Sequence, residues 1–216
     1  MIFMNIQRRA WVLGCVALLC ATTSGCALVS QLQYAIHGYK TEAKFKGLEG
    51  KKVAVVCFSE SSGPSNEASV IASQIGTILA ANVKKMQVIP QAKVADWIDR
   101  NDSDQTDFLD VGRGVKADMV IGIDLSSFSI HEGQTLLKGR AETTIRVFDM
   151  KKNGDMVYGP TTKNSIFPVN AARHATENEN EFRRFFLYNV AQDIARDFYS
   201  YDRMEDYAQD TAFSSN

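Results

Sequence analysis

Residues 51–58 run Lys-Lys-Val-Ala-Val-Val-Cys-Phe, an apolar stretch with lysines before it and the polar residues 59–65 after it. A short β-branched run bounded by turn residues is typical of a strand buried on both faces. Apolar side chains then recur every three or four positions from Val70 to Val83, the spacing of one helix face. Strand, polar loop and helix in this order predict the opening unit of a domain that combines helices with a sheet.

The sequence after this unit predicts two further strands, two short helices and a hairpin. A short strand over 86–90 ends at a proline, and helices follow over 93–100 and 106–115. A second buried strand begins at Ala117 and continues as alternation to Ile130. A long strand over 136–150 leads to a turn containing Asn153-Gly154, a pair that tolerates positive φ, and a returning strand follows over 156–167.

The segment 178–203 is predicted to be a long helix. Its apolar ridge recurs every fourth position: Phe182, Phe186, Val190, Ile194 and Phe198. An aromatic stripe at helical spacing is far more often core than a ligand site, so this helix should cover the sheet. The fold class is therefore α+β, close to a three-layer α/β arrangement. We expect a mixed sheet with an N-terminal strand-helix-strand unit, antiparallel hairpin strands and a long C-terminal helix.

The amino terminus has the pattern of an export signal. Arg8 and Arg9 precede an apolar stretch at residues 10–21, which is too short for a membrane-spanning helix of roughly 20 residues. A positive flank, a short apolar core and small residues after it are typical of a secretory signal peptide. We expect a signal peptide over 1–25, a tether over 26–50, a domain over 51–203 and a disordered tail over 204–216.

Ser24-Gly25-Cys26 after this apolar stretch resembles a bacterial lipobox. The resemblance implies that Cys26 becomes a diacylglyceryl, palmitate-bearing cysteine and the first residue of a membrane-anchored mature chain. Thr23 stands where an aliphatic residue is usual, which leaves cleavage without lipidation as an alternative. The residue after Cys26 is Ala27 and not the aspartate that retains some bacterial lipoproteins in the inner membrane. The sequence therefore favours an anchor in the outer membrane, with the domain in the periplasm.

Composition and cysteine positions limit the partners and the activities that the sequence supports. A net charge of −1 gives no reason to expect a nucleic-acid partner. Cys57 is the one cysteine inside the predicted domain, so neither a disulfide framework nor a multi-cysteine metal site is expected. Cys57 with His131 or His174 could form a nucleophile and a base, which defines a secreted cysteine hydrolase as one alternative function. The competing interpretation is a small apolar side chain in a buried strand, and we predict no enzyme, cofactor or metal.

Three stretches resemble motifs of a known α/β module: Val53–Phe58, Ala117–Gly122 and Val147–Gly154. They are similar to the amino-terminal domain of TolB, to CsgG-type secretion lipoproteins and to LpoB-type activators of cell-wall synthases. The resemblance covers about residues 50–200. It implies a non-catalytic module that binds another envelope protein of secretion, transport or cell-wall assembly, and it allows an oligomer. A pore-forming CsgG-like secretion subunit, which would form a ring, is a second alternative.

The fold class also suggests where a partner would bind. Ligands of α/β sheets favour the loops at the carboxyl ends of parallel strands. We therefore expect docking at a sheet edge or at the carboxyl ends of strands 53–58 and 117–124.

Overall fold

The computed structural model describes residues 40–59, 66–101, 107–134, 136–169, 173–174 and 179–202. Its helices are α3 (Asn66–Asn82), α4 (Gln91–Arg100), α5 (Phe108–Gly114) and α6 (Glu179–Ala195), with a 3₁₀ turn η1 (Met150–Lys152). Its strands are β1 (Lys40–Thr41), β2 (Lys52–Ser59), β3 (Gln87–Val88), β4 (Met119–Glu132), β5 (Leu136–Asp149), β6 (Asp155–Phe167), β7 (Arg173–His174) and β8 (Tyr201–Asp202).

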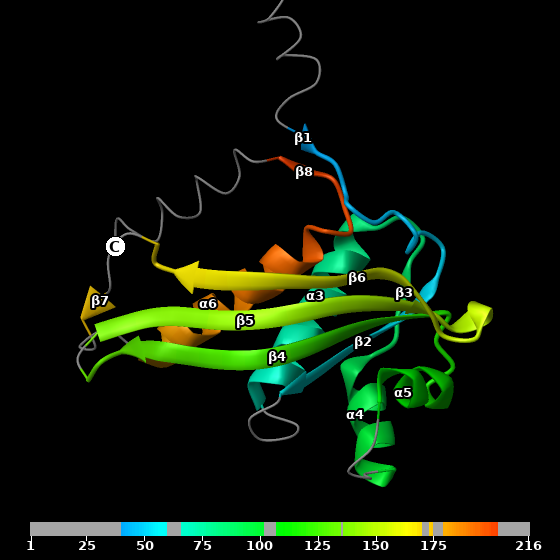
Figure 1. Cartoon of the computed structure of the whole chain (residues 1–216), viewed down its shortest axis with the longest axis horizontal. Coiled ribbons are helices and arrows are strands. Elements are labelled where there is room, and N and C mark those ends of the chain that lie inside the picture. The colour runs from blue at the N-terminus through cyan, green and yellow to red at the C-terminus, as the bar shows by residue number, and fades with distance from the viewer. Residues whose placement is uncertain are drawn as a thin grey trace, which may run out of the picture. The chain divides into compact units, whose positions relative to one another are not determined.

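The main sheet is mixed and has the strand order β3-β2-β4-β5-β6, with β7 also paired to β5 (Figure 1). β2 is parallel to β3 and β4, and the strands β4, β5 and β6 form an antiparallel meander. This arrangement confirms the predicted α+β class. Residues 42–200 form one compact unit, and the antiparallel pair of β1 and β8 belongs to a second unit.

One face of the sheet packs against α3 and α6 (Figure 1). The predicted ridge on α6 lies in this core, and the ring of Phe186 is fully buried. Ala141, Thr143, Ile145 and Val147 of β5 share this face, as the alternation of the sequence predicts. The C-terminal helix therefore covers the sheet as expected.

The other face is covered only in part. The helices α4 and α5 place Val94 and Val111 over Val56 of β2 and Val120 of β4 in a smaller core. Farther along β4, β5 and β6, this face is not covered by any helix among the described residues, and Figure 1 shows it turned to the viewer. The domain therefore has one closed face and one half-open face.

The C-terminal helix ends earlier than predicted, at Ala195 instead of residue 203. The N–H of Asp197 bonds the carbonyl of Ile194 and that of Phe198 bonds Ala195, so the chain tightens into i to i+3 turns. Phe198 is nevertheless buried, as the ridge predicts. Phe198 follows Ile194 by four positions, and this spacing buries its side chain whether the chain continues as a helix or tightens into turns. The apolar periodicity therefore overestimates the length of the helix.

Part of the segment predicted as a tether packs on the domain. Leu48 is 1% exposed, and the ring of Phe45 lies 5.6 Å from that of Tyr158 and 6.3 Å from that of Phe198. We call residues 42–50 the strap. The compact unit starts with this strap at Glu42, before the residue 51 at which periodic sequence patterns begin.

Candidate interaction surfaces

Cys57 lies in the middle of the sheet, with its side chain in the core beneath α3. Burial raises the pKa of its thiol to about 12, and the charge of Asp124 adds to the shift. The thiolate is the nucleophilic form of cysteine, so a group with this pKa is inert near neutral pH.

The histidines do not meet Cys57. Cys57 pairs with Ile123 on β4, and His131 stands eight residues farther along that strand, about 26 Å away at 3.3 Å per residue. The imidazole of His131 lies 3.5 Å from the carboxylate of Glu179. His174 belongs to β7, which pairs with the start of β5. The structure thus assembles no nucleophile–base pair from these residues.

In the described part of the chain, no three His, Cys, Asp or Glu side chains lie close enough together to hold a metal ion. In the same part, no helix is both long and apolar enough to cross a bilayer. Cys26, the predicted lipidation site, lies outside the described residues.

The carboxyl ends of the two central parallel strands do not form a common edge. β2 ends at Ser59, opposite Leu125, while β4 continues to Glu132. The loop that follows β2, residues 60–65, is outside the described residues. The described structure therefore presents the end of β2 beside the middle of β4, and not a cleft between two strand ends.

β6 forms the long open edge of the sheet. It pairs with β5 along its length, and no described strand pairs with its outer side. Met156 and Ile166 are apolar side chains on β6 that are 48% and 47% exposed. They pair with Phe148 and Arg140 of β5, which point to the half-open face, so both lie at the margin of that face.

The half-open face itself is polar. Arg146 of β5 forms an ion pair with Asp124 of the neighbouring strand β4. The guanidinium of Arg140, also on β5, contacts Glu132 of β4 at 2.5 Å. These cross-strand pairs balance charges of opposite sign and keep the face solvated. The combination of a polar face and an apolar margin along β6 was not foreseen from the sequence. The alternation in 156–167 could have indicated it, because Met156 and Ile166 are apolar at positions that face outward.

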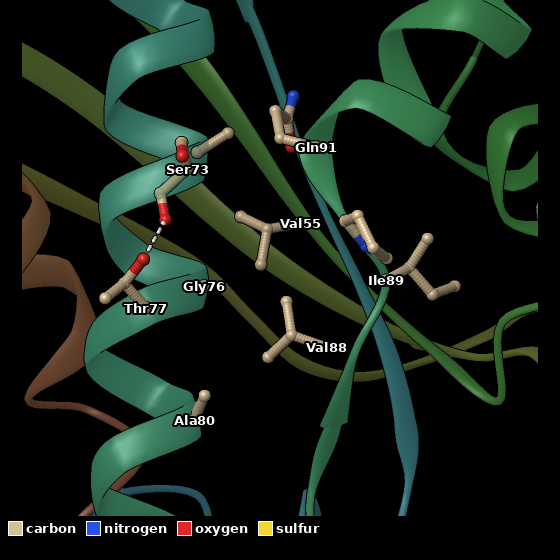
Figure 2. A pocket seen from close by; sticks show the side chains of 10 residues that line it. Val55, Ser73, Gly76, Thr77, Ala80, Val88, Ile89 and Gln91 are labelled. Atoms are coloured by element: carbon tan, nitrogen blue, oxygen red, sulfur yellow. Dashed lines mark hydrogen bonds between the residues drawn. The ribbon is translucent and has the colours of Figure 1, made fainter.

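A groove of about 360 Å³ lies at the opposite edge, between α3 and the short strand β3 (Figure 2). The side chains of Val55 and Val88 form its apolar wall, and Gly76 leaves room on the helix side (Figure 2). The hydroxyl of Thr77 donates to the carbonyl of Ser73 at 3.0 Å, so it is satisfied within α3. The lining carries no charged side chain, and the groove suits an apolar group better than a charged ligand.

A buried ionic network fastens the strap to the C-terminal end of α6. The carboxylate of Asp197, 2% exposed, lies 2.9 Å from the ammonium of Lys44 and 3.1 Å from that of Lys163. It also accepts a hydrogen bond of 2.9 Å from the hydroxyl of Tyr158. The N–H of Phe45 bonds the carbonyl of Asp197. Burial raises the pKa of Tyr158, and the hydrogen bond to Asp197 raises that of Lys44.

No family model and no curated protein matches the chain. Similar solved structures include lipoprotein GNA1162 from Neisseria meningitidis, which is 14% identical, with 67% of this chain and 97% of that chain covered and a TM-score of 0.43. The PelC dodecamer from Paraburkholderia phytofirmans is 12% identical, with 70% and 91% covered and a TM-score of 0.39.

The C-terminal domain of LpoB from Salmonella enterica is a third similar structure, 14% identical, with 56% of this chain and 84% of that chain covered and a TM-score of 0.35. LpoB is one of the proteins whose motifs the sequence resembles. Bacterial lipoproteins are therefore among the solved structures that are similar to this chain.

Proposed function

We propose that the chain is a lipid-anchored protein of the cell envelope whose α/β domain binds another envelope protein without catalysis. The open edge of β6 is the observation that carries the proposal. Unpaired backbone groups along an edge strand can bond an extended segment of a partner, and exposed side chains beside them give specificity. Met156 and Ile166 are such side chains, and both are about half exposed.

The predicted anchor gives this binding its context. Lipidation of Cys26 would confine the domain to one membrane surface, which raises its effective concentration near partners in that membrane. We place it on the outer membrane, facing the periplasm, from Ala27. The burial and raised pKa of Cys57 weigh against the alternative of a cysteine hydrolase.

Two measurements test the proposal. The intact mass of protein purified from membranes should correspond to a chain that begins at Cys26 and carries acyl groups, and Cys26→Ser should lose them. A mass that begins at another residue, without acyl groups, would refute the anchor.

Photo-crosslinking tests the β6 edge. A photoreactive residue at Thr162 or Ile166, both exposed on β6, should capture one defined envelope protein in intact cells. The same residue at Ser69, which is exposed on α3, serves as the control. Equal capture from both elements would refute the edge as the docking site. A ring-shaped oligomer of this chain in detergent would favour the pore-forming alternative.

A further inference from the structure

Seven lysines lie together at one end of the domain although they are far apart in the sequence. They come from the start of β2, the residues after α3, the residues after α5 and the turn η1: Lys51, Lys52, Lys84, Lys85, Lys116, Lys151 and Lys152. Figure 1 shows the start of β3 and the turn η1 at this same end of the sheet. We call this set of residues the lysine end.

Hydrogen bonds and an ion pair join these four segments. The N–H of Gly50 bonds the carbonyl of Lys84, and the N–H of Lys52 bonds the carboxylate of Asp118 at 2.9 Å. The carbonyl of Asp118 accepts from the N–H of Met150, and its carboxylate lies 3.0 Å from the ammonium of Lys151. The lysines therefore share one surface that the fold fixes.

The surface carries an excess of positive charge. The carboxylates within or next to its four segments are Glu49, Asp118, Asp149 and Asp155. Asp118 pairs with Lys151, and Asp149 lies 4.0 Å from Lys152. Five lysines of the set have no ion pair among the described residues: Lys51, Lys52, Lys84, Lys85 and Lys116. The whole chain has 24 basic and 25 acidic residues, so the excess is local.

Helix termini explain only part of this charge. A lysine after a helix complements the negative end of its dipole, which accounts for Lys84 after α3 and Lys116 after α5. Lys51 precedes a strand and Lys152 lies in a turn, so neither has that role. A common acceptor outside the domain explains the whole set, because anions are attracted to all seven ammonium groups at once.

The strap connects the lysine end to the predicted anchor. It joins β2 at Lys51, with Leu48 buried and Gly50 bonded to Lys84. Residues 26–41, which precede it, can extend over at most about 55 Å at 3.3–3.6 Å per residue. An anchored chain thus enters the fold at Glu42 and leads along the strap to the lysine end, which stays within reach of the membrane.

We propose that the lysine end binds the anionic phospholipid headgroups of the membrane that carries the anchor. The proposal rests on the proposed function, since the anchor supplies the proximity. Each lysine close to an anionic leaflet strengthens binding by about fivefold. The attraction falls off over a Debye length of about 8 Å at physiological salt, so it acts only when this end faces the surface. The domain would then be oriented, with β6 lying along its side available to a partner.

The test separates lipid binding at the lysine end from the acyl anchor. Residues 26–216 carrying Cys26→Ser are mixed with vesicles of phosphatidylcholine alone or with phosphatidylglycerol added, at low and high salt. One variant neutralises four of the five lysines without ion pairs: Lys51→Gln, Lys84→Gln, Lys85→Gln and Lys116→Gln. The matched control removes four charges elsewhere, on α4, β5 and α6: Lys93→Gln, Arg100→Gln, Arg140→Gln and Arg184→Gln.

We expect binding only to the vesicles with phosphatidylglycerol, weakened by salt and weakened at least about tenfold by the lysine variant but not by the control. Circular dichroism should show both variants folded, and Lys84→Gln with Lys85→Gln alone should give an intermediate loss. Equal weakening by the control, or equal binding to phosphatidylcholine, would overturn the proposal. Tighter binding of an oligonucleotide through the same lysines would also overturn it. The intact-mass measurement at Cys26 is independent of these vesicles, so a failed anchor and a failed lysine end are distinguishable.

Discussion

Replacement of Asp197 by alanine should destabilise the domain strongly, because its buried side chain holds partners from both the strap and β6. Its carboxylate is 2% exposed and binds Lys44, Lys163 and the hydroxyl of Tyr158. Removing one partner of a buried ion pair typically costs 3–5 kcal/mol, because the remaining charge stays buried without a counter-charge.

The structure places the cost at the lower end of that range. The ammonium of Lys163 retains the carboxylate of Asp193 at 3.3 Å, and Lys44 is 59% exposed, so water solvates it when the pair is lost. We therefore expect a loss of about 3 kcal/mol in the free energy of unfolding. For a domain of this size, that loss lowers the thermal midpoint by about 6–12 °C.

Two neighbouring variants serve as controls for this network. Lys44→Ala removes an exposed partner and should cost less than about 1 kcal/mol. Tyr158→Phe removes one hydrogen bond to a charged acceptor and should cost about 1.5–3 kcal/mol. Urea unfolding followed by far-ultraviolet circular dichroism measures all three. If Asp197→Ala costs less than about 1 kcal/mol, or no more than Lys44→Ala, the network does not fasten the strap and this reasoning is wrong.

Further measurements address the core, the strap and the acid stability. Cys57 should not react with a thiol reagent at neutral pH until urea unfolds the chain, since its pKa is about 12; rapid labelling of the folded protein would contradict this. Leu48→Ala should cost about 2–5 kcal/mol in urea unfolding, because the side chain is 1% exposed, whereas a loose tether would lose almost nothing. The N–H of Lys52 and then Lys151 lower the pKa of Asp118, so its contribution is complete above its ordinary pKa of 3.8 and lost as the pH falls through the lowered value. Asp118→Asn should therefore reduce stability at neutral pH and flatten its decline in acid, and an unchanged acid profile would refute this role.

Much of the fold could be predicted because hydrophobic periodicity is local information. Residues 53–57 of the apolar run are buried on both faces of β2, and the alternation after Ala117 continues into β4. The pair Asn153-Gly154 adopts positive φ at the hairpin, as its composition predicts. The packing of the strap on the domain was not predicted, because Phe45 and Leu48 show no helical or strand periodicity. Buried side chains without such periodicity cannot be recognised from the sequence.

The candidate surfaces could be predicted less well. A sheet edge was expected as a docking site, but that β6 is the edge strand depends on the pairing order of the whole sheet. Cys57 and His131 are both present in the sequence, and only strand register shows that they lie far apart. Asp197 is one polar residue within a helical sequence pattern, and its partners are two lysines and a tyrosine that other segments bring to it.

The sequence by itself determined the α+β class, the order of the elements and the export and lipobox pattern, because these depend on residues close together in the chain. The tertiary structure alone decided which strand lies at the edge and where charge collects. Lys51, Lys84, Lys116 and Lys151 are separated by more than thirty positions each, in a chain whose net charge is −1. They form one surface because the ends of α3 and α5, the start of β2 and the turn η1 meet at one end of the sheet. Electrostatic attraction depends on distance in space, and folding is what sets that distance.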